Sequence, residues 1–256
     1  MTPLQRALVE KAGNDHGFEY VLPANDHTVK LASARHRVQV CISAIDGQYT
    51  LSFTSPASTL LSAELARSLP ALRRSADSFV APDQVALTQV LRRAAELAHA
   101  LPNQAVRDFE ASLTQELTQL PEELKNTEVE RLVRQRIGQQ AFRSAMVDYW
   151  DGACAVTGIA LSEVLRASHA KPWAACDSDT ERLDVFNGFL LSANLDALFD
   201  RFLISFSDAG TLLLSPRITP DTQARLGLTQ PLCLRWLAEE HQPYLNYHRN
   251  RFGALM

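Results

Sequence analysis

Residues 187–200, which read NGFLLSANLDALFD, decide the fold that we predict for the second half of the chain. The first two residues, Asn-Gly, are typical of a tight turn. The apolar run that follows, Phe189–Leu191, has the length of a short buried strand. Asn194 comes next and is a favourable N-cap residue for a helix. The stretch therefore predicts a turn, a strand and a helix in that order.

Two carboxylates lie on this predicted helix, and a histidine lies upstream of it. Asp196 and Asp200 are four residues apart, so they share one helix face. Residues 167–173 read ASHAKPW, in which a β-type run ends in His169 shortly before Pro172. The proline favours a strand end at which the chain enters a loop. The segment thus predicts a strand, a loop, a second strand and a helix, with one imidazole and two carboxylates able to converge.

These three side chains suit the hydrolysis of a phosphodiester. A neutral histidine accepts a proton from water, and carboxylate oxygens bind hard divalent cations that polarise a phosphate. Each residue also has a structural interpretation when it is taken singly. A histidine before a proline is more often structural, Asp196 complements a helix N-terminus, and Asp200 caps a turn. The ordered combination therefore carries the functional hypothesis.

This combination resembles the HNH endonuclease family, in the branch common among bacterial restriction-type nucleases. The resemblance covers residues 127–252, about half of the chain. Its other parts are CAVTG at 154–158, LISF at 203–206, RQRIGQ at 134–139, Phe142-Arg143, Tyr149-Trp150 and YLNYHR at 244–249. The resemblance implies a ββα-metal finger near residues 150–215.

The resemblance also implies a role for each matching position. His169 resembles the family's first histidine, the general base, and Asn187 resembles the middle asparagine, which holds the loop that carries this histidine. The family's third residue is a metal ligand. We favour Asp196, nine residues after Asn187, with Asp200 as a partner ligand. Asn194 stays open as the alternative ligand.

The implied cofactor is one divalent metal ion, Mg²⁺ in the first place, with Mn²⁺ or Ni²⁺ as alternatives. Two positions depart from the pattern of related families. Ser168 stands before the first histidine, where an acidic residue or a histidine often binds metal, so the ligand set is thin. Cys154 is followed by Thr157 instead of a second cysteine, and none of the four cysteines forms a C-x-x-C pair. We therefore expect no structural zinc and interpret the cysteines as reduced, buried thiols.

Four basic side chains are candidate DNA-binding residues: Lys171, Arg143, His248 and Arg249. For each, a solvated or structural role is an alternative. The composition does not indicate a nucleic-acid binder, because 29 acidic residues exceed 25 basic ones and the net charge is −4. Arginine makes up 21 of the 25 basic residues, which suits bidentate phosphate contacts. Binding to double-stranded DNA must therefore rest on local patches of charge.

The first half of the chain predicts a separate small α+β module, residues 1–122, that resembles no family. A helix is expected at 4–12, followed by alternating strands at 28–33, 37–43 and 48–54, with a hairpin turn at Asp46-Gly47. Helix-type periodicity then covers residues 61–69, 85–97 and 109–120. We place the domain boundary at residues 121–126. Residues 127–130 match a capping box that opens the nuclease domain, residues 127–256.

We therefore expect an α+β protein in which a recognition or regulatory module precedes a ββα-metal nuclease acting on double-stranded DNA. Restriction of foreign DNA, with or without dependence on base modification, is the implied role. The alternatives are a nonspecific or RNA-directed nuclease, and a DNA-binding protein whose degenerate site no longer cuts. A third possibility, compatible with the main expectation, is that residues 1–120 form a binding module for a modified base or small ligand and that the nuclease is its effector.

Two expectations concern assembly and location. Apolar helices between residues 60 and 120 provide surface for a homodimer that cuts both DNA strands, or else they form the module's own core. The chain has no apolar run of 18 residues and no secretory start, which argues against a membrane span and favours a cytoplasmic protein.

Overall fold

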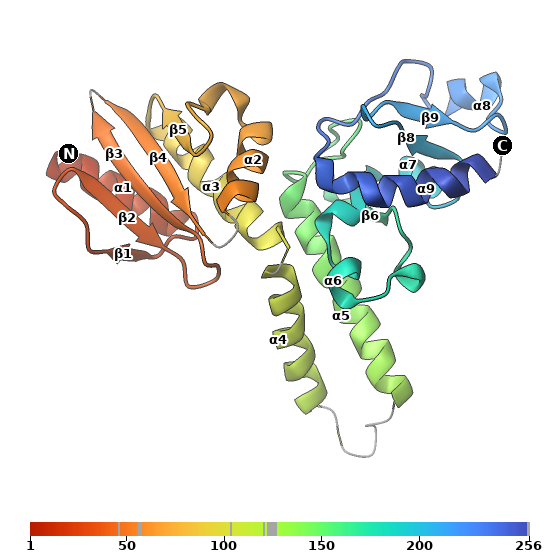
Figure 1. Cartoon of the computed structure of the whole chain (residues 1–256), viewed down its shortest axis with the longest axis horizontal. Helices are drawn as coiled ribbons and strands as arrows, with labels where there is room; N and C mark the ends of the chain where they lie inside the picture. Colours follow the sequence, from red (N-terminus) through yellow and green to blue (C-terminus); the bar gives the residue numbers. More distant parts are fainter. Residues whose placement is uncertain (46, 56–57, 103, 120, 122–126, 255–256) are drawn as a thin grey trace. The chain divides into compact units, whose positions relative to one another are not determined.

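The computed structural model describes residues 1–45, 47–55, 58–102, 104–119, 121 and 127–254 (Figure 1). Two compact units make up the chain, residues 1–99 and residues 100–256, called here the first and the second unit. The division lies before the boundary that we predicted at 121–126, of which residues 122–126 fall outside the described residues. The reason is packing: α4 (Gln104–Gln119) lies along α5 (Thr127–Tyr149) and so belongs to the second unit (Figure 1).

The first unit is built on a five-stranded antiparallel sheet whose strands follow chain order. The strands are β1 (Tyr20–Leu22), β2 (Thr28–Ala32), β3 (Gln39–Ile45), β4 (Gln48–Thr54) and β5 (Ser78–Ala81). The three predicted strands are β2, β3 and β4. Sequence periodicity missed β1 and β5, which have three and four residues. Ile45 pairs with Gln48, so β3 and β4 form the expected hairpin, although Asp46 of its turn lies outside the described residues.

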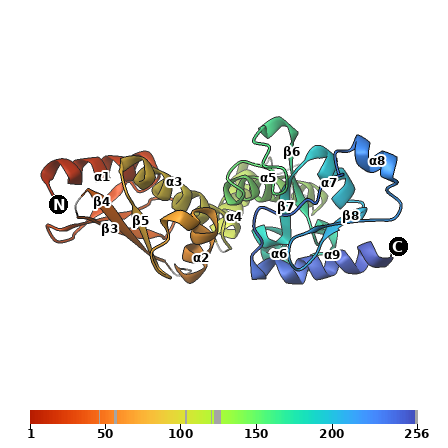
Figure 2. The ribbon, with the colours of Figure 1, turned by 90° about the horizontal axis from the view of Figure 1, so that it is seen from above.

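One face of this sheet carries the core of the first unit. Alternate residues point to this face, and the pairs Val29↔Ile42 and Leu51↔Phe79 lie on it, all fully buried. The helices α1 (Pro3–Asp15) and α3 (Gln84–Ala100) lie on the same side of the strands (Figure 2). The third helix, α2 (Ser58–Ser68), packs near β4.

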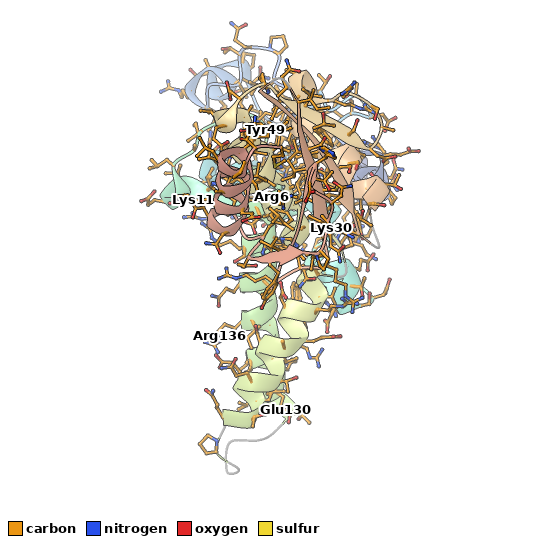
Figure 3. The ribbon with its side chains drawn as sticks, turned by 90° about the vertical axis from the view of Figure 1, so that its left-hand side faces the viewer. Arg6, Lys11, Lys30, Tyr49, Glu130 and Arg136 are labelled. Atoms are coloured by element: carbon orange, nitrogen blue, oxygen red, sulfur yellow. The ribbon has the colours of Figure 1, made fainter. Side chains whose placement is uncertain are left out.

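Polar residues occupy the other face of the sheet, among them Lys30, which is labelled in Figure 3. Leu87, Val90 and Leu91 of α3 are fully buried. The apolar residues of this helix therefore contribute to the unit's own core, which was one of the two interpretations left open by the sequence.

The second unit contains the predicted order of strand, loop, strand and helix. The two strands, β6 (Leu165–His169) and β7 (Gly188–Ser192), are antiparallel, and α7 (Ala193–Phe199) follows β7 directly. The N-cap of α7 is Ser192, and Asn194 is the second residue of the helix, which corrects the predicted cap. Because the helix already begins at residue 193, the Asn194 side chain accepts a hydrogen bond from the Ser192 hydroxyl (2.7 Å).

Shorter elements connect and extend this unit. The segment between β6 and β7 holds the 3-10 turn η4 (Trp173–Ala175), α6 (Asp179–Arg182) and the 3-10 turn η5 (Val185–Asn187), and another 3-10 turn, η3 (Ser162–Val164), precedes β6. A second hairpin, β8 (Ile204–Phe206) and β9 (Leu212–Leu214), comes after α7. The chain then runs through α8 (Pro220–Arg225) and the 3-10 turn η6 (Glu239–His241) to α9 (Gln242–Ala254).

Gly188 begins β7 where that strand comes closest to the end of β6. Its backbone is extended, and the predicted turn lies just before it, as the 3-10 turn η5 that ends at Asn187. A Cβ atom at this position would lie 2.2 Å from the carbonyl oxygen of Ser168, the residue before His169. Only glycine allows this approach without moving the backbone. The residue therefore sets the distance between the two strands next to His169.

An aromatic cluster holds the end of α5 against the hairpin of β6 and β7. The Trp150 ring stacks on the Trp236 ring, with centroids 4.6 Å apart, and Phe189 of β7 stacks on His241, with centroids 5.4 Å apart. Trp150, Phe189 and His241 are fully buried. This cluster fixes the helix that carries several side chains of the candidate site. No helix among the described residues has the length and apolar character needed to span a bilayer.

The first unit has a buried histidine, His36, in its core. Only 6% of this residue is exposed, and its ring lies edge-on to Phe18 (5.0 Å between centroids) and His99 (5.3 Å). Neither ring nitrogen makes a well-formed hydrogen bond to any part of the chain that the structure describes. Burial, and then the charge of His99, lower the pKa of His36 to about 4. The ring is therefore neutral in the folded protein at pH 7.

We predict that the first unit loses stability as the pH falls below about 6.5. In the unfolded chain His36 takes up a proton near pH 6.5, whereas the folded form stays neutral down to about pH 4. The stability present above pH 6.5 is thus lost between these two values, and the loss is on the order of 3 kcal/mol. The His36→Phe variant should remove this dependence.

The measurement can separate the two units. All three tryptophans, Trp150, Trp173 and Trp236, lie in the second unit. Urea unfolding followed by far-ultraviolet circular dichroism reports both units, and tryptophan fluorescence reports the second alone. His36→Phe should flatten the pH dependence of the transition that fluorescence does not report. A first unit that remains as acid-sensitive as in the wild type would show that other groups cause the loss.

Candidate active site

His169 is the last residue of β6, and aromatic rings and a carbonyl fix its imidazole. The ring stacks on Phe142 of α5, with centroids 3.7 Å apart and planes at 15°, and Trp173 lies edge-on at 6.0 Å. Its Nε2 atom is 2.9 Å from the carbonyl oxygen of Arg182. Because a carbonyl only accepts, Nε2 carries the proton and Nδ1 keeps a lone pair. The tautomer therefore makes Nδ1 the basic atom.

The charge state of His169 is set by its surroundings. Burial lowers the pKa of the imidazole, and this effect outweighs the hydrogen bond to Arg182 and the negative charge of Asp200, which raise it. The ring is neutral at pH 7 as a result, so that Nδ1 can accept a proton. A neutral imidazole of known tautomer has what a general base requires.

The Arg182 side chain fixes the loop segment whose carbonyl binds His169. Its guanidinium donates to the carbonyl oxygens of Trp173 (3.2 Å) and Cys176 (2.6 Å), and to the carboxylate of Asp179 (3.0 Å). These bonds connect both ends of the segment from η4 to α6. The loop that leaves His169 therefore folds back and supplies the carbonyl that fixes the same histidine.

The Asn187 side chain lies inside this loop and forms hydrogen bonds to its main chain. The side chain is fully buried. Its Oδ1 atom accepts from the Lys171 amide (2.8 Å), and Nδ2 donates to the carbonyls of Lys171 (3.2 Å) and Glu181 (3.1 Å) and to Cys176 Sγ (3.3 Å). Its own carbonyl accepts from the Ala170 amide (3.0 Å). Asn187 thus makes the loop contacts that the resemblance implies for this position, and its part in catalysis stays a prediction.

Asp196 lies on α7 and Asp200 is the C-cap of this helix, which packs against β6. Burial raises the pKa of the Asp196 carboxyl, the Ser168 hydroxyl lowers it, and the charge of Asp200 raises it. The Ser168 hydroxyl is buried close to this carboxylate, but it makes no hydrogen bond of good geometry in the described part of the chain. Asp200 is exposed, and its charge acts on both Asp196 and His169. The two carboxylates and the imidazole are therefore electrostatically coupled.

The oxygen atoms at this place fit a hard divalent cation. Asp196 and Asp200 supply carboxylate oxygens, and the buried Ser168 hydroxyl, which acts on the Asp196 carboxyl, adds a further polar atom. Within the described residues, no three histidine, cysteine, aspartate or glutamate side chains are arranged as a metal site. A cation here would keep several waters, as Mg²⁺ commonly does. Asn194, the alternative ligand, is exposed, and its Oδ1 atom already accepts from Ser192.

Two of the predicted DNA-binding residues have structural partners instead. Lys171 is 15% exposed, and its Nζ atom forms ion pairs with Glu181 (2.7 Å) and Asp177 (3.2 Å). The hydrogen bond to Glu181 is the largest cause that raises the pKa of Lys171. Arg143 donates to the carbonyls of Leu165 (2.8 Å) and Ser162 (3.2 Å) and so joins α5 to the start of β6. A phosphate would have to compete with these partners for either residue.

The other two lie on α9, and the structure corrects the prediction for one of them. His248 is 1% exposed and stacks on Phe199. Its Nε2 atom is 2.9 Å from the Phe199 carbonyl, and Nδ1 is 3.0 Å from the Ser205 hydroxyl. Burial lowers the pKa of His248 to about 4, so this neutral core residue cannot reach DNA. Arg249 binds the Phe206 carbonyl (2.9 Å) and Asp208 (2.7 Å).

Sequence reasoning missed several residues that shape the site. Phe142 belongs to a quoted motif, but nothing in the sequence placed its ring on His169. The contribution of Arg182 is a main-chain carbonyl, which has no sequence signature. Cys154 agrees with its expected place in the core, since its Sγ atom is buried and accepts from the amides of Ser192 (3.3 Å) and Thr157 (3.4 Å).

Comparison with known proteins agrees with this geometry. Residues 154–207 match the family model described as HNH endonuclease. The matched segment spans β6, the loop, β7 and α7, and it contains His169, Asn187, Asp196 and Asp200. The match supports an HNH endonuclease domain in this part of the chain and a nuclease function in general. No curated protein matches the chain.

We predict that Asn187→Ala destabilises the second unit by about 3 kcal/mol. The substitution leaves the amide and carbonyl groups of the loop without partners in a buried place, at a cost of roughly 1–3 kcal/mol for each group. Urea unfolding followed by tryptophan fluorescence measures the change. Asn250→Ala, at an exposed position of α9, is the matched control and should shift stability by less than about 0.5 kcal/mol. Equal stability of the two variants would show that the loop does not depend on Asn187.

Proposed function

We propose that this chain is a metal-dependent DNA endonuclease that hydrolyses phosphodiester bonds with His169 as the general base. The observation that carries the proposal is the hydrogen bond from His169 Nε2 to the Arg182 carbonyl, which leaves Nδ1 as the basic atom. The charge of Asp200 acts on this imidazole and also on the neighbouring carboxyl of Asp196. The match to the HNH endonuclease model over the same residues supports DNA as the substrate.

The protein's own groups account for the proton transfer. Nδ1 of His169 takes a proton from a water molecule, and the water oxygen attacks the phosphorus atom while the bond to the leaving oxygen breaks. The stack on Phe142 and the Arg182 carbonyl keep the ring in one orientation, so little reorganisation is needed. The imidazolium that forms is stabilised by the charge of Asp200.

We further propose that Asp196 and Asp200 hold one divalent ion, with Mg²⁺ as the first candidate and Mn²⁺ or Ni²⁺ as alternatives. When bound, such an ion polarises the scissile phosphate and stabilises the leaving oxygen. The fit of the donor set and the like-charged pair of carboxylates support this assignment. Asn194 is the alternative ligand.

The biological role that we propose is restriction of foreign DNA, with the first unit as the recognition module. The support is the branch that the sequence resembles and the separate fold of residues 1–99. A DNA-binding protein that does not cut is the second candidate, and it is favoured by the lack of a three-residue metal cluster within the described residues. Turnover in the presence of a divalent metal distinguishes the two. A homodimer that cuts both strands stays a prediction of the sequence.

We predict that His169→Gln lowers the rate of plasmid cleavage by about 10²–10⁴-fold, because the general base is lost. Binding of duplex DNA and unfolding by urea should change little. The rate is measured under single-turnover conditions with Mg²⁺ and with Mn²⁺, and EDTA serves as the blank. His27→Ala, an exposed histidine of the first unit, is the control and should cleave like the wild type. Cleavage by His169→Gln at the wild-type rate would remove this residue from the mechanism.

We also predict that Asp196→Asn weakens metal binding more than Asn194→Ala does. A carboxylate ligand contributes a full charge, so its loss should weaken Mn²⁺ binding about tenfold or more, equivalent to ~1.4 kcal/mol. Calorimetric titration with Mn²⁺ measures the affinity in the absence of DNA. The reverse order of the two variants would identify Asn194 as the ligand and leave Asp196 as a charge at the start of α7.

A further inference from the structure

Two exposed arginines lie beside the carboxylates of the candidate site, and no role has been assigned to them so far. Arg166 is in β6, three residues before His169. It points to the same strand face as Ser168, because side chains two residues apart share a face. Ser168 is the residue that lies close to Asp196. Arg166 is therefore on the side of β6 that faces α7.

Arg201 reaches the same place from the other element. It follows Asp200 directly after the end of α7, and its side chain is exposed. One nitrogen of its guanidinium, Nη1, donates to the carbonyl oxygen of Ala197 (3.1 Å). This bond turns the side chain back along the helix towards the turn that carries Asp196. Helix and strand thus each present one arginine at the carboxylates.

Both arginines keep N–H donors that make no hydrogen bond to the residues that the structure describes. Within the described residues, Arg166 donates through Nη1 alone, to the carbonyls of Glu163 (3.0 Å) and Leu165 (2.8 Å). Neither Arg166 nor Arg201 forms an ion pair with a carboxylate of the described chain, although the charge of each acts on Asp196. Lys171, Arg143 and Arg249, in contrast, are engaged by carbonyls and carboxylates.

The charges at this site oppose the binding of DNA. Two carboxylates repel phosphates, and the net charge of the whole chain is −4, so the attraction must be local. An arginine whose remaining N–H groups face solvent offers a planar fork that matches two phosphate oxygens. Two such forks on either side of the carboxylates would hold a DNA strand at two points while its scissile phosphate lies between them.

We propose that Arg166 and Arg201 bind phosphates of the DNA strand that flank the scissile phosphate. The inference rests on the proposed nuclease function and deepens it, since it names the side chains that hold the substrate at that site. It adds two residues to the DNA-binding set suggested by the sequence, of which His248 is buried.

The test is the salt dependence of DNA binding by the full chain. Binding of a fluorescent 30-base-pair duplex is measured in EDTA, where no cleavage occurs, over a series of NaCl concentrations. Each lost phosphate contact should lower the slope of log K against log salt by about 0.9. Arg166→Gln and Arg201→Gln should each show this change and bind about tenfold more weakly, and the double variant should lose about twice the slope. Arg166→Lys and Arg201→Lys keep the charge and should retain the slope.

Arg131→Gln is the matched control. Arg131 is an exposed arginine of the same unit and follows Glu130 in the sequence; Glu130 is labelled in Figure 3. It lies eleven residues before Phe142 in α5, which is about 16 Å along the helix axis. Its removal changes the net charge by the same amount and should leave the slope unchanged. An equal loss of slope in this control would show that only overall charge matters, and the proposal would be wrong.

Further readouts separate this proposal from the nuclease function. Wild-type cleavage of plasmid in Mg²⁺ tests the nuclease function. If the wild type cleaves and both glutamine variants keep the wild-type slope of log K against log salt, the arginine proposal alone fails. A wild type that neither binds nor cleaves duplex DNA overturns both.

Mn²⁺ titration and urea unfolding test whether the arginines only neutralise the carboxylates. Loss of folding stability in both glutamine variants would favour that structural role, whereas equal stability and equal or tighter Mn²⁺ binding is the expected result.

Discussion

The hydrogen bonds of one buried amide, that of Asn187, hold together the loop on which the candidate site depends. Its oxygen and nitrogen pair with the main chain at Lys171 and Glu181, near the two ends of the segment that leaves β6. A buried polar group without a partner costs more than the bond itself contributes, so other paths of this loop are unfavourable. The fixed loop then brings the Arg182 carbonyl to His169, and that carbonyl selects the tautomer. A side chain that touches no substrate in this scheme thereby determines which nitrogen acts as the base.

The local elements of this arrangement were open to prediction because each has a short-range signal. Alternation identified β2, β3 and β4, and the order of β6, β7 and α7 followed from His169, Phe189–Leu191 and the acidic pair. The strands that were missed, β1 and β5, have few residues and depend on pairing with β2 and β4. The compact units divide at residue 99 and not at the predicted 121–126, because α4 packs on α5, a contact that the sequence does not indicate.

Contacts made through the main chain or across the core have no comparable signal. The Arg182 carbonyl could belong to any residue type, and the stack of Phe142 on His169 joins residues far apart in sequence. His248 was predicted to bind DNA, and it lies four residues after Tyr244 on the same face of α9. That face packs inward, where Tyr244 donates to Asp184 (2.9 Å) and His248 contacts Phe199. A helical period alone does not tell which face meets solvent.

The large share of arginine among the basic residues gains a second explanation from the structure. Arg143, Arg182 and Arg249 each donate to main-chain carbonyls, and Arg235 does the same at Trp150 (3.0 Å) and Ala153 (3.2 Å). A planar fork with several donors can satisfy two carbonyls at once, which the single ammonium group of lysine does less precisely. Arginine therefore serves first to fix irregular segments around the hairpin of β6 and β7. Only an arginine whose fork is not used up in this way is able to bind a phosphate. Contact with DNA is thus a property of where each arginine lies and of which donors remain, and the arginine content of the chain does not measure it.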